Sequence, residues 1–224
     1  MSRLSDVEHA DIRAARAMAP ARESVPVKLL GWLSELADQP QLISICAATT
    51  VFGLVSRDRR LARTGARMLA AELLATKLKS VVKHRVDRTR PRVPEDGGAY
   101  RMEAGDDRDS AMNSFPSGHT AGAVAVARAL VRDYSGQRWP AYSAAAAVAA
   151  IQVPRCQHYP SDLAAGAALG LAAEGLVHAV EVAASRIAGA ADGRSTFRTS
   201  PADAVRLPQS SGPISRRYAA SGMP

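Results

Sequence analysis

Apolar and polar positions divide the chain into five Ala-rich apolar stretches, separated by segments rich in Arg, Asp, Gly or Pro. The stretches cover residues 41–56, 62–82, 119–132, 139–153 and 162–185. Alanine and leucine favour helices, and clusters of turn residues between such runs end them. The pattern therefore predicts an all-α helical bundle, and we place this domain at residues 40–188.

Both ends of the chain differ from this body. Residues 4–18 predict a short amphipathic helix, and Pro20 and Pro26 then interrupt the pattern, so we interpret 1–39 as an N-terminal surface arm. Residues 189–224 are rich in Ser, Gly, Pro and Arg with few large apolar residues, which predicts a disordered C-terminal tail. The N-terminus lacks an apolar core followed by a small-residue cleavage pattern, so no cleaved secretory signal is expected.

Hydropathy alone leaves a soluble bundle and a membrane bundle open. A membrane span needs about 20 mostly apolar residues. Gly166 and Gly170 have the small-xxx-small spacing that lets membrane helices approach closely. Ionisable residues within the helical stretches argue against spans, and these are Glu72, Lys77, Arg128, Glu174 and Glu181.

Composition adds a preference for anionic partners. The net charge is +8, which favours phosphate esters, acidic lipid surfaces or nucleic acid. Aromatic residues make up only 4% of the chain and the arginines are dispersed over loops, so we expect no nucleic-acid partner. Two cysteines are too few for a disulfide framework.

The first segment that indicates chemistry is Lys83-His-Arg-Val-Asp-Arg-Thr-Arg-Pro91, directly after an apolar helical stretch. It holds four cationic side chains and His84 within eight residues. Taken alone, such a run is better explained as a solvated basic connector or as long side chains at a membrane edge.

The second segment, Phe115-Pro-Ser-Gly-His-Thr120, opens the Ala-rich stretch 119–132. Free backbone N–H groups and the positive end of the helix would face an anion there, and the hydroxyl of Ser117 would add a donor. An equally good explanation of this segment alone is a helix start with Ser117 as N-cap and His119 exposed.

The third segment is Arg155-Cys-Gln-His-Tyr-Pro-Ser-Asp162. Because His158 and Asp162 are four residues apart, the carboxylate would reach the Nδ1–H of the imidazole on a helical turn. That contact would leave Nε2 of His158 as a basic nucleophile. If Asp162 were only an N-cap, His158 would remain unexplained.

Together the three segments resemble, in order and spacing, the signature motifs of the type 2 phosphatidic acid phosphatase superfamily. That superfamily also includes bacterial acid phosphatases and vanadium haloperoxidases. The resemblance spans about residues 70–175. One departure concerns the third motif, which normally has Ser-Arg beginning seven residues before the histidine, whereas this chain has Ile151 and Gln152. We predict that Arg155 replaces the missing arginine.

The resemblance implies a role for each motif residue. His158 attacks phosphorus, Asp162 orients His158, and His119 protonates the leaving alkoxide. The phosphate is bound by Lys83, Arg90, Ser117 and the Gly118 amide, with Arg155 as the predicted addition. Water then hydrolyses the phosphohistidine. This scheme needs no metal and no cofactor, and a zinc or manganese site built from His84, His119, His158 and Asp162 is the minor alternative.

Short helical members of this superfamily without a cleaved signal are lipid phosphatases of membranes. The resemblance therefore implies a multi-pass protein of the cell membrane with about five spans, acting on a lipid-like phosphomonoester or pyrophosphate. Arginines of the opposite loops, among them Arg57 and Arg138, favour a cytoplasmic place for those loops and an active site that faces outward. The sequence indicates neither the lipid nor the oligomeric state.

Two alternative functions remain open at the level of sequence. One is a soluble acid phosphatase of the same superfamily. The other is a catalytically impaired membrane protein that binds anionic lipids through its basic loops, which the altered third motif would permit.

Overall fold

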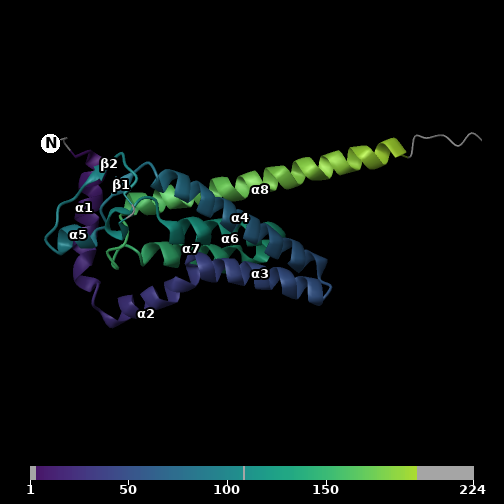
Figure 1. Ribbon diagram of the computed structural model, residues 1–224. Helices are drawn as coiled ribbons and strands as arrows, with labels where there is room; N and C mark the ends of the chain where they lie inside the picture. Colours follow the sequence, from purple (N-terminus) through teal and green to yellow (C-terminus); the bar gives the residue numbers. More distant parts are fainter. Residues whose placement is uncertain (1–3, 108, 196–224) are drawn as a thin grey trace, which may run out of the picture. The chain divides into compact units, whose positions relative to one another are not determined.

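The computed structural model describes residues 4–107 and 109–195 and is mostly helical (Figure 1). The chain divides into two compact units, Met1–Val182 and Ala183–Pro224. Of the second unit, the structure describes only the final part of the last helix. The predicted all-α class is confirmed.

Five helices correspond to the five predicted stretches, and they are α3 (Gln39–Val55), α4 (Arg59–Lys83), α6 (Gly118–Asp133), α7 (Arg138–Ala150) and α8 (Pro160–Ser195). The N-terminal segment contributes α1 (Asp6–Met18) and α2 (Val25–Ser34). Shorter elements complete the chain: α5 (Arg92–Glu95), strands β1 (Asp87–Arg88) and β2 (Met102–Glu103), and the 3₁₀ turns η1 (Ala19–Ala21), η2 (Glu35–Ala37), η3 (Ser110–Met112) and η4 (Ser135–Gln137).

The bundle core consists largely of small side chains. Helix α3 packs on α4, α4 on α6, and α6 on α7. The buried cluster is Cys46, Met68, Ala71, Ala75, Ala121, Ala125, Ala129 and Ala173. A β-carbon on Gly166 or Gly170 of α8 would collide with the backbone of α6, so the small-xxx-small spacing predicted from the sequence does bring two helices into close contact.

The N-terminal segment, interpreted from the sequence as a surface arm, makes buried contacts with the helical bundle. Helix α1 starts with a capping box in which Ser5 and Glu8 bond each other's backbone amides. Its Asp11 is only 3% exposed and pairs with Arg88 of β1. Strand β1 pairs antiparallel with β2. Residues from α1 and from the loop after α4 therefore share one buried contact.

The three motif segments meet at one end of the bundle (Figure 1). Lys83 is the last residue of α4, Gly118 is the first of α6, and His158 lies in the turn before α8. Helix α7 ends at Ala150, three residues before the predicted end at 153, and the chain then turns through residues 151–156. His158 lies in the short non-helical segment between this turn and α8.

The last helix and the surface bear on the membrane question. Helix α8 continues to Ser195, past residue 189 where the disordered tail was predicted to begin, and residues 196–224 lie outside the described part of the chain. Among the described residues, Pro160–Gly189 is the one segment long and apolar enough to cross a membrane, and α3 is apolar but shorter. Large apolar side chains exposed on α2, α3 and α8 include Leu29, Trp32, Val51, Phe52, Leu54, Leu176 and Val180.

Candidate active site

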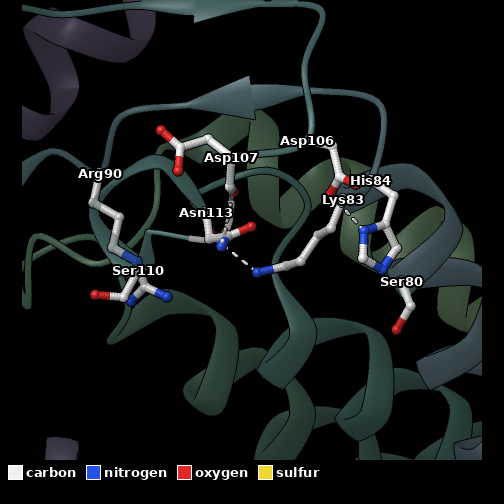
Figure 2. A pocket seen from close by; sticks show the side chains of 8 residues that line it. All are labelled: Ser80, Lys83, His84, Arg90, Asp106, Asp107, Ser110 and Asn113. Atoms are coloured by element: carbon white, nitrogen blue, oxygen red, sulfur yellow. Dashed lines mark hydrogen bonds and ion pairs between the residues drawn. The ribbon is translucent and has the colours of Figure 1, made fainter.

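Two of the predicted phosphate-binding cations line one open cavity of about 360 Å³ (Figure 2). The lining residues are Ser80, Lys83, His84, Arg90, Asp106, Asp107, Ser110 and Asn113. Lys83 Nζ donates to the carbonyl oxygen of Asn113 at 2.8 Å, and Arg90 donates to the side-chain oxygen of Gln157. Burial, together with the charges of Arg90 and Lys79, lowers the pKa of Lys83 to about 8.

His158 is held in a defined tautomer by the backbone. The side chain is almost fully buried, and Nδ1 lies 2.7 Å from the carbonyl oxygen of Ser114. Because a carbonyl oxygen only accepts, Nδ1 carries the proton and Nε2 has a free lone pair. Burial lowers the pKa of His158; Arg90 and Lys83 also lower it, while Asp162 opposes them. The lowered pKa favours the neutral imidazole, with the proton on Nδ1 and the lone pair on Nε2.

Asp162 does not make the direct hydrogen bond to His158 that the sequence predicts. Its Oδ2 lies 3.8 Å from Nδ1, beyond hydrogen-bonding distance. Instead Asp162 accepts from Ser114 Oγ at 2.5 Å and from the Tyr159 amide at 2.8 Å. The physical reason is that α8 starts at Pro160, so His158 precedes the helix and the i,i+4 geometry does not apply. Asp162 fixes Ser114, and the carbonyl of Ser114 fixes His158.

Arg88 links this arrangement to the N-terminal helix. Its guanidinium is 1% exposed, donates to Asp162 Oδ1 at 2.6 Å and to Asp11 Oδ2 at 2.8 Å, and lies 4.2 Å from the ring centre of Tyr159. The sequence analysis missed both Arg88 and Asp11 as parts of the site. Arg88 was visible within the basic segment, but nothing local to Asp11 indicates a partner 77 residues away.

The start of α6 has the N-cap given in one explanation of its segment, while the anion site of the other explanation stays a prediction. Ser117 is the N-cap, and its Oγ accepts from the Thr120 amide at 3.4 Å, so the capping role is confirmed. The helix itself supplies no acceptor for the amides of Gly118 and His119, because the first amides of a helix lie outside its hydrogen-bond ladder. These two N–H groups are free to donate to an anion bound at the N-terminal end of α6.

His119 is not simply exposed. Its Nε2 is buried, and within the described part of the chain it has no hydrogen-bond partner. It lies 4.0 Å from Glu35 Oε2 and 3.9 Å from Asp38 Oδ1. A buried ring nitrogen without a partner, next to two carboxylates, is suited to exchange a proton with a substrate.

Arg155 bonds to residues of the N-terminal segment and not to the other predicted phosphate-binding residues. Its guanidinium donates to Ser34 Oγ at 2.9 Å and to Glu35 Oε1 at 2.7 Å, and it is not among the residues that line the cavity with Lys83 and Arg90. Gln152 is fully buried and donates to the carbonyl of Val148 at 3.1 Å. A contact between Arg155 and phosphate stays a prediction.

The comparison with family models decides which family this site belongs to. Residues 64–188, more than half of the chain, match the model of the PAP2 superfamily. The chain belongs to the PAP2 superfamily. The family resemblance inferred from the three motifs is thereby confirmed, while the individual roles of the residues stay predictions. No curated protein matches the sequence.

Two solved PAP2 structures share the fold. One is the transmembrane PAP2 type phosphatidylglycerolphosphate phosphatase from Bacillus subtilis, 22% identical, with a TM-score of 0.55, covering 80% of this chain and 87% of that one. The other is LpxE from Aquifex aeolicus, 17% identical, with a TM-score of 0.55, covering 75% of this chain and 94% of that one. Both likenesses extend well beyond the motif-bearing end.

A metal site was the minor alternative for this group of residues. Among the described residues, no group of three or more His, Cys, Asp or Glu side chains is arranged to hold a metal ion. His84, one of the four residues considered for a metal site, instead pairs with Asp106 at 2.7 Å. The cationic side chains whose charges act on His158 are Arg90 and Lys83.

Proposed function

We propose that this PAP2 protein is a metal-independent phosphatase that hydrolyses a lipid-like phosphomonoester or pyrophosphate through a phosphohistidine. The observation that carries the proposal is the hydrogen bond from His158 Nδ1 to the Ser114 carbonyl, 2.7 Å long. It leaves the lone pair of Nε2 free, close to the charges of Lys83 and Arg90. A neutral imidazole beside two cations suits attack on an anionic phosphoester.

In the proposed reaction, Lys83 and Arg90 bind the phosphate, and the amides at the start of α6 with Ser117 donate to its oxygens. Nε2 of His158 forms a bond to phosphorus as the bond to the leaving oxygen breaks. His119 donates a proton to that oxygen. Water then attacks the phosphohistidine, which releases phosphate and restores His158.

The surroundings of His158 stabilise the charge that it acquires. The imidazole becomes positive when Nε2 bonds to phosphorus, and the hydrogen bond to the Ser114 carbonyl then strengthens. Asp162, with Oδ2 at 3.8 Å, adds favourable electrostatics without touching the ring. Asp162 therefore acts as a positioning and electrostatic residue, through Ser114.

A lipid substrate is supported by the surface of the bundle and by the neighbours. Exposed apolar side chains on α3, such as Phe52 at 65% and Val55 at 78%, are unusual for a protein surrounded by water and suit contact with lipid tails. One structural neighbour is named as a transmembrane phosphatidylglycerolphosphate phosphatase. We propose a multi-pass protein whose active site faces outward.

The test is phosphate release from a panel of lipid phosphates and diphosphates by the protein purified in detergent. We expect release that survives EDTA, is inhibited by orthovanadate and is abolished by His158→Ala. His9→Ala, at an exposed histidine of α1, is the matched control and should keep wild-type activity. Binding of anionic vesicles without phosphate release would favour the catalytically impaired alternative, and activity lost in EDTA and restored by zinc would overturn the metal-free mechanism.

A further inference from the structure

A lysine that belongs to none of the three motifs lies against the start of α6. Lys79 is one helical turn before Lys83 on α4, so both side chains project from the same face. The stem of Lys79 crosses Gly118: a β-carbon on Gly118 would stand 2.9 Å from Lys79 Cδ and 3.1 Å from Nζ. The ammonium group is therefore placed beside the first amides of α6.

The three cations around this point donate to neutral acceptors, whereas several other partly buried cations pair with carboxylates. Lys79 Nζ donates to the side-chain oxygen of Gln39 at 3.3 Å, Lys83 donates to a backbone carbonyl, and Arg90 donates to a glutamine. All three acceptors are neutral. By contrast, Arg67 pairs with Asp133, Arg88 with Asp162, and Arg155 with Glu35.

Three cations that bond only neutral acceptors repel one another, and this costs free energy. Nearby carboxylates offset part of the charge: Asp162 acts on Lys83 and Arg90, and Glu72 acts on Lys79. Like charges one turn apart on a helix repel each other, and partial burial removes water that would screen them. Lys79 contributes to this repulsion, because its charge is one cause of the lowered pKa of Lys83. A phosphate dianion placed among the three groups would remove the cost.

We propose that Lys79 is a third cation that binds the transferred phosphate, together with Lys83 and Arg90. The proposal rests on the phosphatase function proposed above. Glycine at position 118 is part of the arrangement, since any side chain there would meet the stem of Lys79. Lys79 would supply positive charge at the start of α6. Arg155, the residue predicted to replace the missing arginine, is paired with Glu35 instead.

The experiment measures inhibition and binding of orthovanadate, which mimics the transferred phosphate alone. We expect Lys79→Gln to raise the inhibition constant and to lower kcat/KM, each by roughly 10- to 100-fold, as the loss of one charge-assisted hydrogen bond does. Lys79→Arg should retain activity within a few-fold. Lys77→Gln removes an exposed lysine of the same helix and should change neither quantity. Arg155→Ala should raise the inhibition constant of vanadate less than Lys79→Gln does.

Lys79→Gln with wild-type vanadate inhibition would overturn the proposal. A fall in thermal stability alone would show that Lys79 only balances the buried carboxylate of Glu72. If Lys79→Gln does not fold, Lys79→Met keeps the stem packed on Gly118 and answers the same question. If the wild type releases no phosphate, the proposed function fails, and calorimetry of vanadate binding to wild type and Lys79→Gln still tests Lys79.

Discussion

At the scale of single residues, the reactivity of His158 depends on a backbone atom. The carbonyl oxygen of Ser114 holds Nδ1–H, and Asp162 secures that carbonyl by accepting from the Ser114 hydroxyl. A motif that names only side chains does not reveal this step. Removal of the Asp162 carboxylate would therefore affect His158 indirectly, because Ser114 would lose the acceptor of its hydroxyl group.

The ionisation of Lys83 and His158 predicts a pH profile. Lys83 must be protonated to bind phosphate, and its pKa is lowered to about 8, so kcat/KM should fall as the pH rises through about 8. His158 must be neutral to attack, and its pKa is lowered, so the acidic limb should lie below the usual range of histidine. Initial rates at low substrate concentration across pH 5 to 10 measure both limbs.

Lys83→Arg provides the control, because a guanidinium stays charged throughout this range. The variant should lose the fall near pH 8 that deprotonation of Lys83 causes, even if its activity is lower. The fall at lower pH, caused by deprotonation of His119 whose pKa burial lowers, should remain. The alkaline limb of kcat should lie at higher pH than that of kcat/KM, since bound phosphate favours protonated Lys83. An alkaline limb unchanged by Lys83→Arg would assign it to another group.

At the scale of elements, α1 is part of the active-site structure. Asp11 and Asp162 share the guanidinium of Arg88, and all three side chains are buried. Removing one partner of a buried ion pair typically costs about 3–5 kcal/mol. We expect Asp11→Ala to lower the stability of the detergent-solubilised protein by about that amount and to reduce kcat, because Arg88 then no longer holds Asp162 in place.

Asp6→Ala is the matched control for this prediction, since Asp6 is an exposed carboxylate of the same helix. Its effect on the free energy of unfolding should stay within about 0.5 kcal/mol. Thermal unfolding followed by circular dichroism compares the two variants. Equal melting temperatures for Asp11→Ala and wild type would show that α1 is not coupled to the site.

The helices could be predicted because the residues that determine them are close together in the sequence. Ala-rich stretches bounded by turn residues indicate α3, α4, α6, α7 and α8 to within a few residues at most boundaries, and the motifs identify Lys83, Arg90, His119 and His158. The pairing of Asp11 with Arg88 joins residues far apart in the sequence and leaves no periodic signal. Asp162 does lie near His158, but the expected direct hydrogen bond is replaced by a distance of 3.8 Å, because His158 precedes the helix that begins at Pro160.

At the scale of the whole molecule, the proposed orientation in the membrane makes a prediction about access. The loop after α5 lies at the active-site end, and the turn between α6 and α7 lies at the other end of α6. The native Cys46 and Cys156 are buried. A membrane-impermeant maleimide should therefore label Ala99→Cys in intact cells and Gly136→Cys only after permeabilisation. The reverse pattern would place the active site on the cytoplasmic side.

The most direct test of the account is to trap the covalent intermediate. The enzyme is mixed with a ³²P-labelled substrate that it turns over, quenched in alkali, in which phosphohistidine is stable, and mapped by mass spectrometry. The account predicts labelled phosphate on His158, with more label in His119→Ala when the leaving group is acidic, because water then lacks its general base. Rapid turnover without label on His158, or with label on another residue, would contradict the account.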